Sequence, residues 1–355
     1  GIVDEFSNLD IRVELLTGSI KGKKREKLLA EIENGLVDIV IGTHALIEND
    51  VIFKNLGLII IDEQHRFGVV QRKLLREKGS LANLIVMSAT PIPRSLALTI
   101  YGDLDVSIID ELPSGRIPIK TKWIKNEEER QKMYNFIAGK IKEGRQVYVV
   151  SPLIEESETL NVKSAQETFE EYRHIFSDKR IGLIHGRQTY KEKQDVMKRF
   201  KNHELDILIS TTVIEVGVNV PNASVMVIRD AQRFGLSSLH QLRGRVGRGK
   251  YSSYCFLESE TDNALSVRRL EVMERTTDGF KIAEEDLKLR NSGEILGTKQ
   301  SGVSDMMFTD IVKNVKEIKL VRDYVMAYLE KYNGDIRNEY LKMDIYEKFH
   351  RKVVE

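Results

Sequence analysis

Two acidic side chains directly follow a short apolar segment in the first part of the chain. The apolar residues 58–61 precede Asp62 and Glu63. A strand of a parallel sheet delivers the residues that follow it to the carboxyl edge, where such sheets bind ligands. There an aspartate can hold Mg²⁺, and a glutamate can orient and deprotonate the water that attacks a phosphate. The alternative interpretation is a strand that ends in a solvated acidic turn. If the two carboxylates were the only signal, this alternative would be preferred, but the other segments of the chain favour the phosphate site.

Two hydroxyl side chains follow another apolar run. Ser88 and Thr90 stand between Met87 and Pro91. Alone, Thr90 before Pro91 would be no more than the N-cap of a helix. Together with the acidic segment, the two hydroxyls predict a loop that couples the state of the bound nucleotide to the binding of nucleic acid.

Two arginines stand three residues apart in the second half of the chain. The segment 241–249 has the order Gln-x-x-Gly-Arg-x-Gly-Arg-Gly, which places Arg245 and Arg248 on one side of a helical turn. Guanidinium groups bind phosphate bidentately and can stabilise the charge of phosphoryl transfer. A general nucleic-acid-binding patch is the alternative, and the fixed residue order makes it the minority interpretation.

Short apolar, β-branched runs alternate with helix-like stretches, a pattern typical of parallel sheets with crossover helices. The expected strands are 11–16, 38–42, 58–61, 84–87, 120–123, 146–150, 181–183, 207–210, 225–228 and 254–257. The expected helices are 21–34, 127–143, 191–200, 263–276 and 311–331. The sequence therefore predicts an α/β protein with a helical C-terminal region.

Length and composition limit the class of protein. The chain has 355 residues, of which 41% are hydrophobic and 31% are charged. At roughly 150 residues per domain, this length favours two domains and an appendage. The composition excludes a disordered or fibrous protein. Because the net charge is only +1, any surface that binds nucleic acid must be a local one.

The sequence also bears on location. No apolar run approaches the roughly 18 residues of a membrane span, and the first residues show no signal-peptide pattern. The single cysteine, Cys255, cannot form an internal disulfide. We therefore expect a cytoplasmic protein.

Four segments together resemble motifs II, III, V and VI of the superfamily 2 helicases and translocases. They are residues 62–65, 87–94, 210–221 and 241–249. The resemblance implies two RecA-like, P-loop NTPase-type domains with parallel sheets that pair around ATP. The implied boundaries are 1–113 for a truncated first domain, 114–258 for the second, and 259–355 for a translocation motif with helices.

Other segments resemble the RecG-type helicases more specifically. These are the runs 62–69, 152–158 and 231–236. Residues 278–290 and 296–302 are similar to the translocation motif that RecG-type helicases share with the transcription-repair coupling factor Mfd. The resemblance spans essentially the whole chain.

This resemblance implies an ATP-dependent DNA helicase that hydrolyses ATP with Mg²⁺. Its partner would be branched double-stranded DNA, such as stalled forks and Holliday junctions, in DNA repair and recombination. Two alternatives stay open: a non-enzymatic DNA-binding or structural fragment, and an Mfd-like translocase on double-stranded DNA.

The resemblance also assigns roles to residues. Asp62 would serve Mg²⁺ and Glu63 the attacking water, while Gln241, Arg245 and Arg248 would contact the nucleotide. Further nucleotide-binding residues are Gln64, His65, Gly217 and Asn219. Residues expected to contact DNA or to couple nucleotide state to movement are Gly18, Ser19, Gly42, Thr43, His44, Ser88, Thr90, His185, Gly186, Thr211, Thr212, Arg290 and Gln300.

The sequence departs from the family pattern in three respects. The phosphate-loop motif Gly-x-x-x-x-Gly-Lys-Ser/Thr does not occur, and residues 18–24 do not meet its spacing. The family's DNA-binding wedge domain is also missing. Asn291 and Ser292 stand where the family typically has Gly-Pro. We therefore expect a C-terminal fragment that is inactive alone and self-associates through its first domain, and a parent protein that is monomeric.

Overall fold

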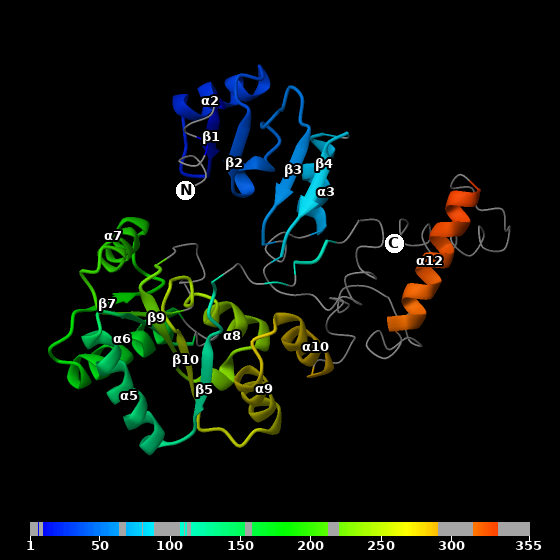
Figure 1. The fold of residues 1–355 in the computed structure, drawn as a ribbon. Coiled ribbons are helices and arrows are strands. Elements are labelled where there is room, and N and C mark those ends of the chain that lie inside the picture. The colour runs from blue at the N-terminus through cyan, green and yellow to red at the C-terminus, as the bar shows by residue number, and fades with distance from the viewer. Residues whose placement is uncertain are drawn as a thin grey trace. The chain divides into compact units, whose positions relative to one another are not determined.

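The computed structural model describes residues 6, 10–63, 69–79, 81–88, 107–109, 111, 115–152, 158–211, 220–289 and 315–332. The chain divides into two compact units, residues 1–89 and residues 90–355 (Figure 1). The domain boundaries expected at residues 113 and 258 stay predictions. No helix of the described residues is long and apolar enough to cross a membrane.

The first unit contains two pairs of parallel strands. Strand β1 (Val13–Leu16) pairs with β2 (Ile39–Gly42), and β3 (Leu58–Ile61) pairs with β4 (Asn83–Val86). The helices are α2 (Lys23–Glu33) and α3 (Val69–Glu77), with the 3₁₀ turn η1 (His44–Leu46) after β2. All four strands expected in this part are confirmed, with ends that differ by at most two residues.

The core of the first unit is small. Leu28 and Ile32 of α2 pack with Leu16, Ala45 and Val51. The outer face of the β3–β4 pair is apolar and exposed, with exposed fractions of 48% for Leu58, 57% for Ile60 and 46% for Ile85. Parallel sheets are normally covered on both faces. Among the described residues of this pair, Ile59 and Ile61 on the opposite face are buried.

The second unit is built on six parallel strands in the order β5-β10-β9-β6-β8-β7. The strands are β5 (Lys120–Ile124), β6 (Gln146–Val150), β7 (Ile181–Ile184), β8 (Ile207–Ser210), β9 (Ala223–Ile228) and β10 (Tyr254–Glu258). All six strands expected in this part are confirmed. The fold is the predicted α/β class with parallel sheets.

Figure 1 labels the helices of the second unit. They are α5 (Glu127–Lys142), α6 (Glu158–Ile175), α7 (Tyr190–Lys201), α8 (Leu236–Arg243), α9 (Ala264–Arg275), α10 (Gly279–Leu289) and α12 (Val315–Lys331), with the 3₁₀ turn η4 (Ala231–Arg233). The expected helices 127–143, 191–200, 263–276 and 311–331 correspond to α5, α7, α9 and α12.

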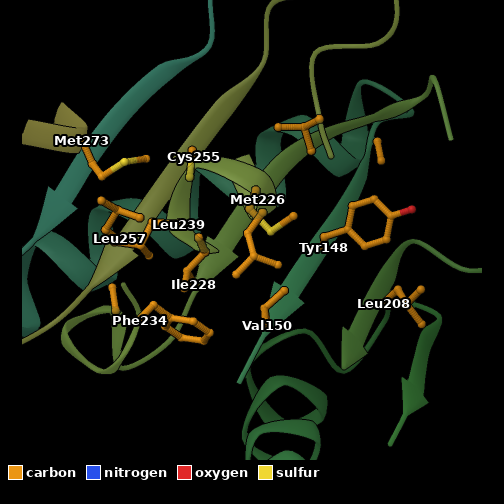
Figure 2. Packing of buried hydrophobic residues seen from close by; sticks show 14 of the residues in the cluster. Tyr148, Val150, Leu208, Met226, Ile228, Phe234, Leu239, Cys255, Leu257 and Met273 are labelled. Atoms are coloured by element: carbon orange, nitrogen blue, oxygen red, sulfur yellow. The ribbon is translucent and has the colours of Figure 1, made fainter. Parts of the chain in front are cut away.

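The six-stranded sheet separates two apolar cores, because alternate residues of a strand point to opposite faces. On one face, Val147 and Val149 of β6 pack with Met133 of α5 and Tyr172 of α6. On the other face, strand residues pack with α8 and α9. Figure 2 shows this second core, with Tyr148, Met226, Ile228 and Leu257 from strands beside Leu239 and Met273 from helices.

Helix α6 was not predicted from the sequence. Its inner face consists of Ala165, Thr168 and Tyr172, and Phe176 follows just beyond its end. Thr168 interrupts the apolar stripe, and its hydroxyl bonds with Ser151 Oγ at 3.0 Å and with Ser164 O. A polar residue with an internal partner is stable in a core, but it hides the helical period in the sequence.

Candidate functional site

Asp62 and Glu63 lie at the same edge of the β3–β4 pair as Ser88. Ile61 pairs with Val86 in register, and Met87 N donates to Ile61 O at 2.8 Å. The residues that follow β3 and β4 therefore emerge side by side. The acidic segment and Ser88 therefore lie together at the carboxyl edge of the β3–β4 pair.

The backbone at Glu63 is unusual. Its φ is 51°, in the left-handed region that residues other than glycine rarely adopt. Glu63 N donates to Asp62 Oδ1 at 2.8 Å, which holds the two acidic residues in a fixed turn. Such backbone strain is concentrated at functional sites. Asp62 remains exposed, so its carboxylate is accessible to a ligand.

A second edge carries hydroxyls and backbone amides in the first unit. Leu16 pairs with Gly42 at the ends of β1 and β2. A Cβ at Gly42 would lie 2.3 Å from Leu16 O, so only glycine fits there. Beyond this pair, Gly18 and Ser19 follow β1, while Thr43 and His44 follow β2, and all four are exposed. The structure thus brings together five residues predicted for DNA contact.

His185 and Thr211 meet at the corresponding edge of the second unit. Ile184 pairs with Ser210 at the ends of β7 and β8, and Thr211 N donates to Ile184 O at 3.3 Å. Thr211 is fully buried, and its hydroxyl has no hydrogen-bond partner among the described residues. Gly186 follows His185 and is exposed.

The loop of His185 is positively charged. Lys193 Nζ donates to Gly186 O at 3.0 Å and so lies over this loop. The pKa of His185 is lowered, first by burial of the imidazole and then by the charges of Lys193 and Arg187. A neutral imidazole beside two cations can bond to a phosphate without itself being charged.

Arg245 and Arg248 follow α8 in a tight turn. Gly247 between them has φ +77°, which favours glycine. Arg248 Nε donates to Gly244 O at 3.2 Å, while Gln241 is half-buried in the last turn of α8. Gln241, Arg245 and Arg248, the residues predicted for nucleotide contact, thus extend from the end of α8 and the turn that follows it.

Arg243 anchors this segment, although the sequence did not single it out. Its buried guanidinium donates to Met273 O and Thr276 O, both at 2.9 Å, and bonds with His240 Nδ1 at 3.1 Å. Helix α8 is thereby tied to the end of α9. The pKa of His240 is lowered to about 4, first by burial and then by Arg243.

Arg116 also reaches the arginine turn. Its Nε donates to Gly247 O at 3.2 Å across a sequence separation of 131 residues. Although Arg248 is exposed overall, its pKa is lowered by desolvation and then by the charges of Arg245 and Arg116. No motif covers Arg116, and no local signal in the sequence could have identified it.

Eight predicted site residues lie outside the described residues. They are Gln64, His65, Thr90, Thr212, Gly217, Asn219, Arg290 and Gln300. Within the described part of the chain, no group of three or more His, Cys, Asp or Glu side chains converges to hold a metal ion.

Three family models match the chain in succession. A DEAD/DEAH box helicase model matches residues 2–99, and a helicase conserved C-terminal domain matches residues 128–250. The third, described as ATP-dependent DNA helicase RecG, domain 3, C-terminal, matches residues 276–352.

Relatives with curated names are similar over most of the chain. ATP-dependent DNA helicase RecG of Staphylococcus epidermidis is 51% identical over 314 residues, which is 88% of this chain and 46% of that protein. The protein of the same name from Staphylococcus aureus has the same identity and coverage. The chain spans about half the length of these relatives.

Solved structures show the same fold. A structure of RecG bound to a three-way DNA junction is 46% identical with a TM-score of 0.67, covering 89% of this chain and 41% of that one. Saccharomyces cerevisiae Dbp5 bound to RNA and ADP BeF3 is 15% identical with a TM-score of 0.54, covering 89% and 76%. The second likeness concerns the fold alone.

Proposed function

Because the chain belongs to the RecG-type helicases, we propose that the protein is an ATP-dependent DNA helicase that translocates on and remodels branched DNA. The observation that carries this proposal is the arginine turn at residues 245–248, which follows the α8 helix and is held by bonds from Arg248 Nε to Gly244 O and from Arg116 Nε to Gly247 O. The similarity to a RecG structure bound to a three-way DNA junction supports branched DNA as the substrate.

The acidic edge of the first unit suits phosphate chemistry. Asp62 is exposed and engages one carboxylate oxygen with Glu63 N, so a hard oxygen ligand is available for Mg²⁺. Bound Mg²⁺ would neutralise charge on the β- and γ-phosphates of ATP. Glu63 orients and deprotonates the attacking water.

The arginine turn supplies positive charge for the transferred phosphate. Arg245 and Arg248 each present a planar fork that matches phosphate oxygens. Gln241 belongs to the same segment and contacts the nucleotide. The two arginines repel each other without an anion, and a phosphate relieves that repulsion.

The two glycine- and hydroxyl-bearing edges suit the DNA backbone. Gly18, Ser19, Gly42 and Thr43 offer amides and hydroxyls, and His185 offers an imidazole beside cations. Contacts of this kind position DNA without reading its sequence. Arg290 and Gln300 remain the predicted coupling residues.

A matched pair of variants tests the function in the full-length gene product. Glu63→Gln removes the carboxylate assigned to the water, and Glu33→Gln makes the same change at the exposed end of α2. We expect Glu63→Gln to abolish DNA-stimulated ATP hydrolysis and junction unwinding while junction binding persists. Glu33→Gln should behave as the unmodified protein. Unimpaired hydrolysis by Glu63→Gln would contradict the proposal.

The 355 residues alone are expected to hydrolyse no ATP above background, because they contain no phosphate-loop motif. The non-enzymatic DNA-binding fragment therefore remains the second candidate for this chain by itself. Cytoplasmic location, a monomeric full-length protein and self-association through the first unit likewise stay predictions. An ATPase assay with and without DNA distinguishes the two functions.

A further inference from the structure

Residues 115–119 lie against the arginine turn before they enter β5. Arg116 is partly buried, and its Nε donates to Gly247 O at 3.2 Å. Ile119 packs on the same glycine: a Cβ at Gly247 would lie 2.9 Å and 3.1 Å from two Ile119 side-chain carbons. The turn is therefore braced on this side by a segment from far away in the sequence.

The opposite end of the turn is braced by another segment. A Cβ at Gly249 would lie 2.3 Å from Pro221 O, so the backbone at Gly249 lies directly against Pro221. Arg248 stands between the two contacts, one residue from each glycine. Because both neighbours of Arg248 are fixed, the direction of its side chain depends on these two braces.

The Arg116 bond acts on the backbone that sets the directions of Arg245 and Arg248. Gly247 has φ +77°, and its carbonyl accepts from Arg116. A left-handed glycine has other accessible conformations. The bond from Arg116 holds Gly247 in one of them, and with it the backbone from which the Arg248 side chain extends.

Arg116 also adds charge. It lies close enough to Arg248 to lower the pKa of that group. Within the described part of the chain, the hydrogen bonds of Arg116 and Arg248 go to the backbone carbonyls of Gly247 and Gly244, and neither forms an ion pair with a carboxylate. Their positive charge is left for an anion.

We propose that Arg116 is a positioning residue for ATP hydrolysis, which holds the Gly247 turn so that Arg245 and Arg248 face the phosphates and which adds a third positive charge beside them. This inference rests on the proposed function. It assigns a role to a residue that lies outside every motif of the sequence analysis.

Steady-state ATP hydrolysis by the full-length gene product, with saturating junction DNA, tests the inference. We expect Arg116→Ala to lower kcat by about 10- to 100-fold, the loss typical of misplaced catalytic groups. The KM for ATP should change by less than about 3-fold, because the lost interaction acts in the transition state. Arg116→Lys keeps the charge and one donor for Gly247 O, and should recover kcat to within about 5-fold of the unmodified protein.

Arg145→Ala is the matched control. Arg145 is also partly buried, donates to Asn222 Oδ1 at 2.8 Å and stacks on the Tyr251 ring at 3.3 Å. We expect Arg145→Ala to lower the thermal unfolding midpoint at least as much as Arg116→Ala does, while the kcat for ATP hydrolysis stays unchanged.

Three results would overturn this inference without affecting the proposed function. They are an unchanged kcat in Arg116→Ala, a kcat in Arg116→Lys as low as in Arg116→Ala, and weaker DNA binding by Arg116→Ala with an unchanged kcat. If the unmodified full-length gene product hydrolysed no ATP, the proposed function would be overturned, and the inference with it.

Discussion

The carbonyl of Pro221 lies against the backbone of Gly249, so closely that a Cβ on Gly249 would be 2.3 Å from the Pro221 oxygen. Pro221 leads into β9, and Gly249 follows Arg248. Real Cβ atoms do not approach a carbonyl oxygen at this distance. The position of the arginine turn is therefore set by a contact between backbones that no side chain could replace.

Gly249→Ala should displace this turn. Because the neighbouring atom is backbone, it cannot move aside as a side chain would, and we expect a loss of about 1–3 kcal/mol in the free energy of unfolding. Chemical denaturation measures it. The control is Gly139→Ala in α5, where nothing lies within 4 Å of the added Cβ. Alanine there should stabilise by about 0.5–1 kcal/mol. Equal effects of the two substitutions would contradict the close contact.

Arg248→Lys in the full-length gene product should reduce ATP hydrolysis by about 10-fold or more, because lysine keeps the charge but loses the planar fork. DNA binding should largely survive. Arg173→Lys is the control, since Arg173 is an exposed arginine on α6 that pairs with Glu170. Hydrolysis rate and junction affinity are measured on the same substrate. Intact hydrolysis in Arg248→Lys would show that this guanidinium has no part in the chemistry.

Replacing Arg290 with Ala tests the division of roles. ATP hydrolysis should persist while fork unwinding fails, because Arg290 is predicted to couple hydrolysis to movement. The two rates are compared on one forked substrate. A parallel loss of both would refute the predicted coupling role.

The contribution of His240 to the free energy of unfolding should fall as the pH drops from about 6.5 to 4. Burial raises the pKa of Glu258 to about 7, and this carboxyl changes stability in the opposite sense over the same range. The folded-state pKa of His240 is lowered to about 4, so between these values the unfolded chain binds more protons than the folded one. The stabilisation from His240 is present above pH 6.5 and is lost as the pH falls through 4, on the order of 3 kcal/mol in all, of which about 2 kcal/mol is lost by pH 5. Denaturation of the unmodified protein and of His240→Gln at pH 7.5 and pH 5 isolates this contribution, and the variant should lose less stability, or gain more, between the two pH values. An unchanged pH dependence in that variant would assign the effect to another group.

Amide hydrogen exchange should be faster in β3 and β4 than in β6 and β8. Leu58, Ile60 and Ile85 leave one face of the first pair exposed, whereas β6 and β8 are buried throughout. Local opening costs less where fewer apolar contacts are lost. Mass spectrometry of exchange in the 355-residue chain makes the comparison. Equal protection of the two pairs would mean that the exposed face is covered in solution.

The strands and their parallel arrangement could be predicted from the sequence, and so could the acidic, hydroxyl and arginine segments that are candidates for the site. The run 58–61 before Asp62 and the paired arginines at 245 and 248 are local patterns. Strand formation depends on the alternation and β-branching of adjacent residues, and a parallel sheet follows from the helices between the strands. These properties are all encoded within short windows.

The residues that hold these segments in place could not be predicted, because they come from distant parts of the chain. Arg116 donates a hydrogen bond to Gly247 O, although the two residues are 131 positions apart in the chain. His185 lies beside Thr211 only because β7 pairs with β8. The burial of Thr168 within α6 depends on its bond to Ser151. Each of these contacts joins side chains or backbone groups from segments that are far apart in the sequence. Many sequences with the same local pattern would place other residues there, since packing depends on the shape of the whole core.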